Sequence, residues 1–422
     1  MRLTRGFKIE YRDDLTHLFK TSKNLYNQAL YILNQEYKNS GKYISYGELD
    51  KIMKRTFNLE KEINYKLLPA QTSQQILKLL DKNYKSFFKS IKDYKSNPTK
   101  YKGTPKPPKY KKEYNILIYT NQNSKIKDKS IKLSKVKEVI KIPKNIWVDE
   151  LLNYKQIRIL PKKSYIKVEI IYEVKELNPK LDKNSYASID LGVNNIITLI
   201  TNIKTRPLII NGKPLKSFNL YYNKLKSKYQ SIKDKQGIKQ NTKRIIKIEE
   251  KRENYFSNIF HQISRKIINY LLDNKISKLV IGYNKEWKND VKMRKSNKQT
   301  FIQIPFNKLL QYLEYKANLV GIEVIYQEES YTSKADALNF DKIPNYKKDK
   351  KGSYQFSGKR VKRGLYKSAK GVLLNSDVNG AINILRKVIG DAFIKLSDIG
   401  LWSNPVKINP LQTIPIKVYN YV

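Results

Sequence analysis

The order of apolar segments in the second half of the chain constrains the fold most strongly. The runs SIDLGVNNIITLI, KLVIGYN and IEVIYQEES have the length and the β-branched content of buried strands. Amphipathic segments of helical period stand beside them, among them FNKLLQYLEYKANLVG and NSDVNGAINILRKVIG. RPLIINGKPL predicts a hairpin strand, and one long basic helical tract is expected from about Leu220 to Leu272. This alternation predicts an α/β domain around a central, partly parallel sheet.

The first half of the chain has a different pattern. One strand is predicted from Arg2 to Tyr11, helical spacing extends from Leu15 to about Tyr94, and short β-type runs return from Asn115 to Val174. Between them, SNPTKYKGTPKPPKYKKEY is either a solvated linker or a lining for a polyanion. We expect a small β-barrel or sandwich that includes the N-terminal strand, with the helical module inserted into it.

The charge of the chain indicates its partner. Lys and Arg number 85 against 37 Asp and Glu, which gives a formal net charge of +48. A polyanion relieves self-repulsion of this size, so nucleic acid is expected, although an AT-rich genome also produces lysine-rich chains. The 32 tyrosines offer stacking surfaces for bases. The candidate nucleic-acid contacts are Lys100, Lys102, Lys106, Lys109, Lys111, Arg360 and Arg363.

The residue inventory excludes several kinds of chemistry. The chain has no cysteine and only two histidines, His17 and His261, so disulfides, thiolate catalysis and a cysteine or histidine zinc site are excluded. A catalytic metal would be held by carboxylates, which favours Mg²⁺ or Mn²⁺. No signal-peptide segment or run of about 18 apolar residues is present, so we expect a cytoplasmic protein without membrane contact.

Two aspartates stand where a parallel sheet gathers its ligands. Asp190 ends an apolar strand, and Asp377 opens the last predicted helix after two candidate caps, Asn375 and Ser376. The small residues Gly380 and Ala381 would let this helix approach the sheet closely. Each aspartate alone is equally well explained as a polar strand end or a helix cap. Together they predict a divalent-metal site for phosphodiester hydrolysis.

Several segments resemble one known family. IDLGVNNIITLIT, LVIGYNKEWK, FIQIPFNKLLQYLEYKANLVGIEVIYQEESYTSK and GVLLNSDVNGAINILRK resemble the RuvC-like nuclease segments of the TnpB family. These are OrfB-type proteins of prokaryotic insertion sequences and relatives of the type V CRISPR effectors. The resemblance implies an RNase H-type fold and an RNA-guided DNA endonuclease that works with a guide RNA from the mobile element and a double-stranded DNA target, in the cytoplasm at the nucleoid. The guide, the target-adjacent motif and the oligomeric state stay open.

The resemblance also implies a domain order. We expect a wedge β-barrel with an inserted helical recognition module, followed by the nuclease domain. The boundaries are 1–14 for the first wedge strand, 15–95 for the recognition module, 96–114 for the linker, 115–178 for the wedge, 185–330 for the RuvC-like core, 331–374 for a basic insertion, 375–390 for the final helix and 391–422 for a tail.

The chain departs from the family at two places. The glutamate that usually ends the second nuclease strand is replaced by Gly282, and Glu286 is expected in the outgoing loop. The neighbouring strand ends in Glu328 and Glu329, whose side chains would alternate between the two faces of the sheet, and we favour Glu329 as the third ligand beside Asp190 and Asp377. Secondly, the interval 331–374 has no cysteine or histidine, so zinc is excluded and we expect a basic loop or small knuckle on the nucleic acid in place of the family's zinc ribbon.

The sequence also allows three rival interpretations. Loss of the usual glutamate allows a nuclease-inactive, RNA-guided DNA-binding protein, against which both aspartates are retained. An actin-like kinase also has DLG on its first strand, but it would need a later glycine-rich phosphate loop, which the chain lacks. The third rival is a transposase that joins DNA strands itself, whereas the resemblance favours an accessory protein of the element.

Overall fold

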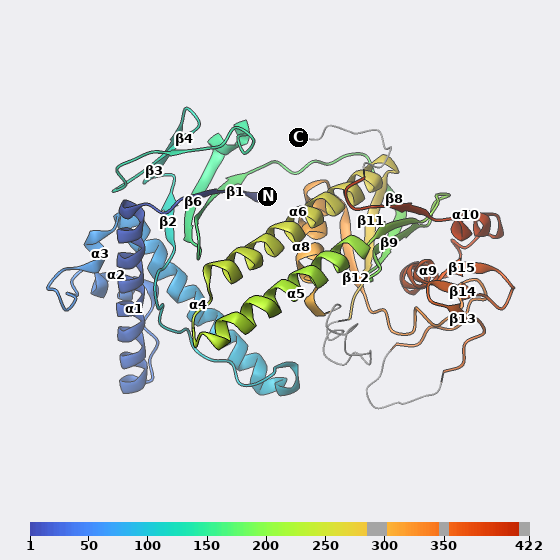
Figure 1. The fold of residues 1–422 in the computed structure, drawn as a ribbon, viewed down its shortest axis with the longest axis horizontal. Helices are drawn as coiled ribbons and strands as arrows, with labels where there is room; N and C mark the ends of the chain where they lie inside the picture. The colour runs from blue at the N-terminus through green and yellow to red at the C-terminus, as the bar shows by residue number, and fades with distance from the viewer. Residues whose placement is uncertain (285–301, 346–353, 413–422) are drawn as a thin grey trace. The chain divides into compact units, whose positions relative to one another are not determined.

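The computed structural model describes residues 1–284, 302–345 and 354–412 and divides the chain into two compact units, residues 1–175 and 176–422 (Figure 1). Parts of the predicted insertion and tail, residues 346–353 and 413–422, lie outside the described residues, as does Glu286. Within the residues that are described, no helix is long and apolar enough to cross a membrane.

The first unit combines long helices with two antiparallel sheets. Strands β1 (Arg2–Ile9), β7 (Ile166–Glu173), β6 (Tyr154–Pro161) and β2 (Leu117–Thr120) form one sheet in that order. Strands β3 (Ser124–Lys127), β4 (Ser130–Leu133) and β5 (Ile140–Lys141) form the other. The alternation in β7 buries every second residue, and this face shares one core with helices α1 (Asp13–Ser40) and α4 (Ala70–Ser96). Short helices α2 (Tyr46–Met53) and α3 (Asn64–Leu67) lie between them in the chain.

The second unit is built on a six-stranded sheet of order β12-β11-β8-β9-β10-β16. Its strands are β8 (Asp182–Asp190), β9 (Asn195–Thr201), β10 (Leu208–Asn211), β11 (Ile276–Gly282), β12 (Glu323–Gln327) and β16 (Val406–Ile408). β8, β9 and β10 pair antiparallel, while β11 lies parallel to both β8 and β12. The expected hairpin strand and the partly parallel sheet are therefore confirmed.

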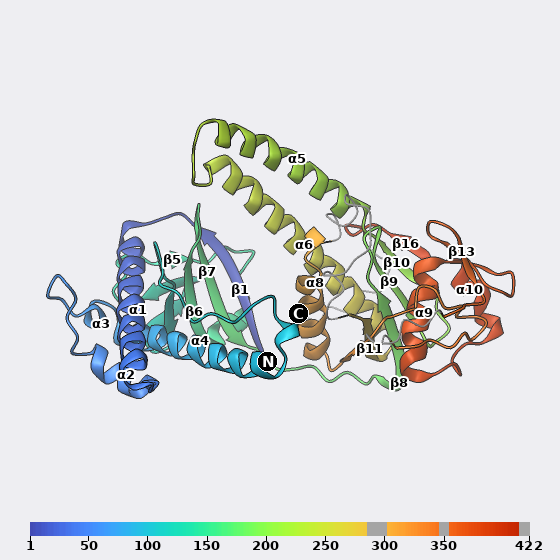
Figure 2. The same cartoon turned by 90° about the horizontal axis from the view of Figure 1, so that it is seen from below.

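Helices cover both faces of this sheet (Figures 1 and 2). Helices α6 (Lys243–Asp273) and α8 (Phe306–Leu319) share one core with Ala187 and Ile189 of β8. Helix α9 (Ser376–Ile389) shares the opposite core with Val280 of β11. Because side chains alternate along a strand, Ser188 and Asp190 face α9, and the Ser188 Oγ donates to the Ala381 carbonyl at 2.7 Å.

The long basic helical tract is two helices rather than one. Helix α5 (Lys213–Lys235) and α6 lie side by side as a hairpin (Figure 2). The break has a local cause, because Gly237 adopts a positive φ of 65° after α5 and the Thr242 side chain caps the first turn of α6. The sequence prediction missed this break, although residues 233–244 contain only one apolar residue, Ile238.

The C-terminal residues also belong to the sheet and core of the second unit. Helix α10 (Ile399–Ser403) places Trp402 in the core beneath α9, where only 2% of its surface is exposed. Strand β16 then pairs with β10 in parallel. The segment predicted as a tail therefore supplies an edge strand and a core tryptophan. A strand of three residues is too short to show a periodic pattern in the sequence, so it was not predicted.

Candidate active site

Asp190 is the last residue of β8 and lies against the first turns of α9. A Cβ atom at Gly380 would meet the Asp190 Oδ2 at 2.7 Å, so only glycine lets the helix approach this carboxylate. The hydrogen bond between Ser188 and Ala381 joins the same strand to the same helix, two residues before Asp190. The close approach that the sequence predicted from Gly380 and Ala381 is confirmed.

Asp377 stands in the first turn of α9. The Asn375 side chain caps the helix by accepting from the Asp377 backbone N–H at 2.9 Å. The Asn195 Nδ2, at the start of β9, donates to the Asp377 Oδ2 at 2.7 Å. Asn375 is thus the cap, whereas Ser376 is the first helical residue. The sequence prediction did not single out Asn195, which orients the carboxylate.

Glu329 occupies the space above Gly282. β12 lies parallel beside β11 with Gln327 opposite Gly282, so the expected neighbour relation of these strands is confirmed. A Cβ atom at Gly282 would meet the Glu329 Oε2 at 2.8 Å and the Ile384 Cδ1 at 2.5 Å. The carboxylate of Glu329, which follows the end of the adjacent strand, therefore fills the position from which a side chain of residue 282 would start.

Glu328 has a different environment from Glu329. Its Oε2 forms an ion pair of 2.7 Å with the Lys387 Nζ on α9, and its Oε1 accepts from the Ser330 backbone N–H at 2.9 Å. The prediction that the two glutamates point to opposite faces of the sheet was wrong, since both carboxylates reach the side of α9. The reason is that β12 ends at Gln327, so strand alternation no longer applies to them.

Like charge and burial perturb the carboxyls at this edge of the sheet. Desolvation, then the negative charges of Glu329 and Asp377, raise the pKa of Asp190 well above its usual value, while Arg360 opposes the shift. Desolvation and the charge of Glu328 raise the pKa of Glu329 to about 7. Asp190, Glu329 and Asp377 thus meet in one electrostatic environment whose negative charge Arg360 and Lys387 offset only in part, whereas Glu328 is paired directly with Lys387.

The donor types suit a hard divalent cation. Carboxylate oxygens are the ligands that Mg²⁺ and Mn²⁺ take, and mutual repulsion among buried carboxylates is the condition that a bound cation relieves. In the parts of the chain that the structure describes, no three carboxylate or imidazole side chains stand at metal-ligand spacing. Binding one ion between all three carboxylates would therefore require these side chains to draw together.

A small antiparallel sheet stands beside the carboxylates. We use the name knuckle for residues 331–345 and 354–375, which include β13 (Lys359–Lys362), β14 (Leu365–Lys367) and β15 (Leu373–Asn375). Arg360 lies on β13, close enough to oppose the pKa shift of Asp190. With the Asn194 amide turned to satisfy its neighbours, its oxygen accepts from the Arg363 Nη2 at 2.8 Å. Both predicted arginines therefore lie near the carboxylate edge.

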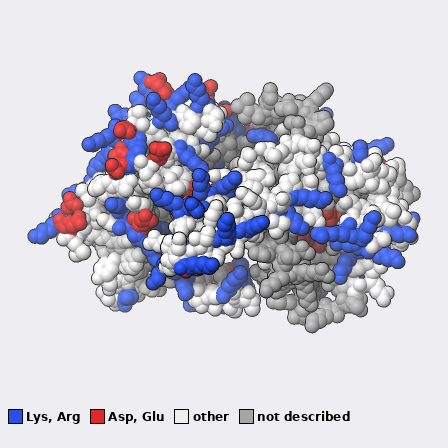
Figure 3. All heavy atoms as spheres, in the orientation of Figure 1, with Lys and Arg blue, Asp and Glu red and all other residues white. Residues whose placement is uncertain are grey.

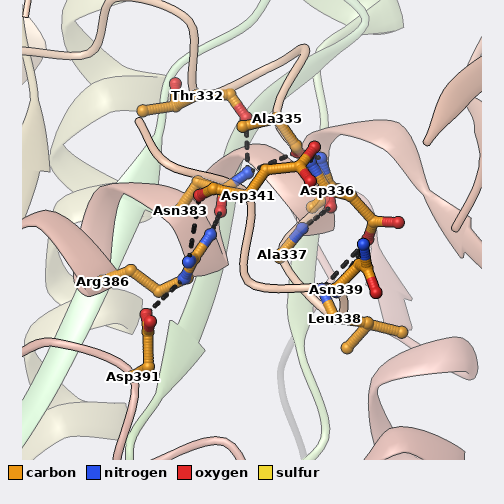
Figure 4. Close-up of polar contacts among 11 residues, drawn as sticks. Thr332, Ala335, Asp336, Ala337, Leu338, Asn339, Asp341, Asn383, Arg386 and Asp391 are labelled. Atoms are coloured by element: carbon orange, nitrogen blue, oxygen red, sulfur yellow. Dashed lines mark hydrogen bonds and ion pairs between the residues drawn. The ribbon is translucent and has the colours of Figure 1, made fainter. Parts of the chain in front are cut away.

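Hydrogen bonds hold the knuckle together around Asp336 (Figure 4). This fully buried carboxylate accepts from the backbone N–H groups of Leu338 and Ala369, at 3.0 and 2.7 Å, and from the Ser368 Oγ at 2.7 Å. Asp341 accepts in turn from the Asp336 backbone N–H at 2.8 Å. We call Asp336, Asp341 and the groups that donate to them the Asp336 node. This node joins segments that are more than 30 residues apart in the chain, and no pattern in the sequence predicted it.

Helix α9 binds the same loop through its polar face (Figure 4). The Asn383 Nδ2 donates to the carbonyls of Thr332 and Ala335, at 2.9 and 2.7 Å. The Arg386 Nη1 donates to the Asn383 Oδ1 at 2.8 Å, and its Nε pairs with Asp391 at 2.6 Å. The helix that carries Asp377 is thereby tied to the knuckle that carries the arginines.

The predicted lysine contacts belong to the first unit. Figure 3 shows Lys and Arg side chains over much of the face that it draws, with Asp and Glu in smaller patches. Lys100 is paired with Asp93 at 2.5 Å, while the Lys111 Nζ stands 5.1 Å from the centre of the Tyr26 ring. The remaining three predicted lysines are exposed: Lys102, Lys106 and Lys109.

The chain is similar to known proteins in sequence and in structure. Residues 169–288 match the OrfB family of IS605 elements, described as a probable transposase, and residues 306–384 match the Cas12f1-like TNB domain. The chain is 22% identical to the putative RNA-guided DNA endonuclease InsQ of Escherichia coli K12, over 98% of this chain and 99% of that protein. These matches support the assignment of the chain to the TnpB family.

Two further comparisons bear on this assignment. The chain is 26% identical to the TnpB-like protein ORF457 of Acidianus two-tailed virus over 49% of its own length, and the match spans only 42% of that viral protein. In structure it resembles Cas12f1 in a complex with guide RNA and target DNA, with a TM-score of 0.53, 15% identity and coverage of 88% of this chain and 81% of that one. This likeness supports the multidomain RuvC-like fold.

Proposed function

We propose that this protein is an RNA-guided DNA endonuclease of an insertion sequence, with Asp190, Glu329 and Asp377 as the carboxylates of its nuclease site. The observation that carries the proposal is the Glu329 Oε2, which stands 2.8 Å from the place where a Gly282 Cβ would begin. A TnpB-type site would thereby regain its third carboxylate from the segment that follows the neighbouring strand. The name of its full-length relative InsQ supports RNA-guided DNA cleavage as the reaction.

The carboxylates would hold Mg²⁺ or Mn²⁺. A divalent cation at such a site activates water and offsets charge on the scissile phosphate and the leaving oxygen. The protein's own residues prepare the site: Asn195 fixes the Asp377 carboxylate, and Lys387 keeps Glu328 engaged elsewhere. Arg360 supplies positive charge next to Asp190, where a DNA phosphate would have to approach.

The remaining assignments follow from this function. The first unit would contain the wedge sheets and the recognition helices, and the lysine-rich surfaces would contact the guide RNA and the target DNA. The knuckle would stand in the place of the family's zinc ribbon, with Arg360 and Arg363 as contacts to the nucleic acid. The enzyme would act in the prokaryotic cytoplasm, at the nucleoid.

A plasmid-cleavage assay tests the proposal. The protein is expressed with its native flanking DNA, the copurified RNA is sequenced, and the complex is incubated with a guide-matched plasmid and Mg²⁺. We expect a linear product, lost by more than about 100-fold in Glu329→Ala because a charge-stabilising group is removed. RNA binding should be retained in that variant.

Glu328→Ala is the matched control, because it removes a neighbouring carboxylate that is paired with Lys387. Cleavage that survives in Glu329→Ala but disappears in Glu328→Ala would refute the choice of residue. A complex that contains RNA and binds the target, but never cuts it, would favour a nuclease-inactive binder. A protein that copurifies with no RNA would overturn the RNA-guided function altogether.

A further inference from the structure

A groove in the first unit lies between helix α4 and the proline-rich segment, far in sequence from the carboxylates. Its volume is about 430 Å³, within the range of small-ligand pockets. One wall is formed by α4 through Asn83, Ser86, Phe87 and Ser90. This wall combines one half-buried aromatic ring with three side chains that donate and accept hydrogen bonds, which is the combination that a nucleobase face and edge require.

The other wall is the extended segment from Pro105 to Lys111. Asn27 of α1 anchors this segment, because its Nδ2 donates to the Lys111 carbonyl at 2.9 Å and its Oδ1 accepts from the Lys111 N–H at 2.8 Å. Pro105 and Pro108 restrict the backbone between the lysines. The C-terminal end of this wall is therefore held in place by a two-point contact at Lys111.

Charge and exposure define what the groove can hold. Lys106 and Lys109 are exposed at its edge, and the Tyr110 ring is 50% exposed. None of the residues that line the groove is Asp or Glu. An uncompensated pair of lysines beside an accessible tyrosine favours a ligand with phosphate charge and an aromatic base.

We propose that this groove binds one unpaired nucleotide of a nucleic-acid strand, with its base against Tyr110 and Phe87 and the flanking phosphates at Lys106 and Lys109. The proposal rests on the proposed function only in that the ligand is a nucleic acid, and it assigns this surface a single-stranded nucleotide instead of duplex backbone. An unpaired nucleotide of this kind comes from either the RNA or a displaced DNA strand. The chemistry recognised is the same in both.

The test uses the full-length chain, freed of copurified RNA, and two ten-nucleotide probes, one ribo-oligonucleotide and one deoxyribo-oligonucleotide, each with a single 2-aminopurine. Stacking of the fluorescent base on an aromatic ring quenches its emission. We expect quenching by the wild-type protein and about tenfold weaker binding, with loss of quenching, in Tyr110→Ala. Tyr110→Phe should keep both properties. Tyr31→Ala, which removes a 55% exposed tyrosine of α1, is the matched control.

Salt dependence tests the phosphate contacts. Lys106→Ala combined with Lys109→Ala should lower the slope of the logarithm of affinity against the logarithm of salt concentration by about 1.4, since each neutralised phosphate of a single strand contributes about 0.7. The double variant Lys89→Ala and Lys92→Ala removes the same charge from α4 outside the groove and should lower it less.

The outcomes separate the two proposals. Quenching with the ribo-oligonucleotide alone assigns the groove to the RNA, and quenching with the deoxyribo-oligonucleotide alone assigns it to DNA. Unchanged quenching in Tyr110→Ala, or equal slopes for the two lysine pairs, overturns the groove assignment. Neither result affects plasmid cleavage in the Glu329→Ala comparison. The groove assignment and the nuclease assignment can therefore be refuted independently of each other.

Discussion

Two aspartates of the second unit, Asp190 and Asp336, are taken out of water in opposite ways. Asp336 receives two backbone N–H groups and a serine hydroxyl, so its charge is balanced by the protein itself. Asp190 instead faces Glu329 and Asp377, and its pKa is raised. A buried carboxylate that is fully hydrogen-bonded stabilises a fold, whereas one placed among like charges is disfavoured in its ionised form unless a cation binds beside it. The same residue type thus marks structure at one place and chemistry at the other.

The largest expected effect is a loss of plasmid cleavage when Asp190, but not Asp336, belongs to the nuclease site. Asp190→Asn should reduce plasmid cleavage by more than about 100-fold, because one charged group of the proposed nuclease site is lost. Its free energy of unfolding without Mg²⁺ should not fall, since the substitution removes repulsion from Glu329 and Asp377. Cleavage rates and urea denaturation of the same preparation measure both. Full cleavage by Asp190→Asn would remove Asp190 from the site.

The next effect should appear at Asp336, as a loss of stability. Asp336→Asn presents an amide N–H₂ to groups that are themselves donors, and such mismatches in a buried position cost about 1–3 kcal/mol. Urea denaturation, with proteolysis of the knuckle as a local probe, measures this cost. Ser357→Ala is a milder control, because Ser357 is exposed and its hydroxyl donates to Asp341 at the edge of the node. An Asp336→Asn protein as stable as the wild type would show that the node does not hold the knuckle.

The contrast between these two aspartates also explains which parts of the fold and of the site could be predicted from the sequence. Apolar runs predicted the sheet, and Asp190 and Asp377 stood out because each follows or begins a strongly patterned element. The strand neighbours were predictable too, which led to Glu329. Alternation failed at Glu328 and Glu329 because it holds only inside a strand, and β12 ends one residue earlier. Asp336 was missed because its partners come from distant loops that have no periodic pattern.

The smallest expected effect is a difference between Glu328 and Glu329 in how each side chain changes the free energy of unfolding with pH. Glu329 has a folded pKa of about 7, above its usual value, so the folded protein holds this proton more tightly than the unfolded chain. The carboxyl therefore costs stability as pH rises from about 4.5 to 7, and without divalent cation Glu329→Gln should be about 1–2 kcal/mol more stable than the wild type at pH 8, with little difference at pH 4.5.

For Glu328, the expected effect of the glutamine substitution on stability at pH 8 has the opposite sign. Desolvation opposes its ionisation, but the hydrogen bonds from Lys387 and Ser330 outweigh it and lower its pKa. Its ionised form therefore stabilises the fold above the unfolded pKa, and this contribution is lost as pH falls, so Glu328→Gln should be the less stable protein at pH 8. Urea denaturation in EDTA at pH 4.5 and pH 8 measures both variants. Since Asp190, Asp377 and Lys387 are common to both proteins, shifts of the same sign at pH 8 would contradict the distinct environments of the two glutamates. Opposite shifts, with Mg²⁺ stabilising the wild type more than Glu329→Gln, would identify Glu329 as the carboxylate that needs a cation.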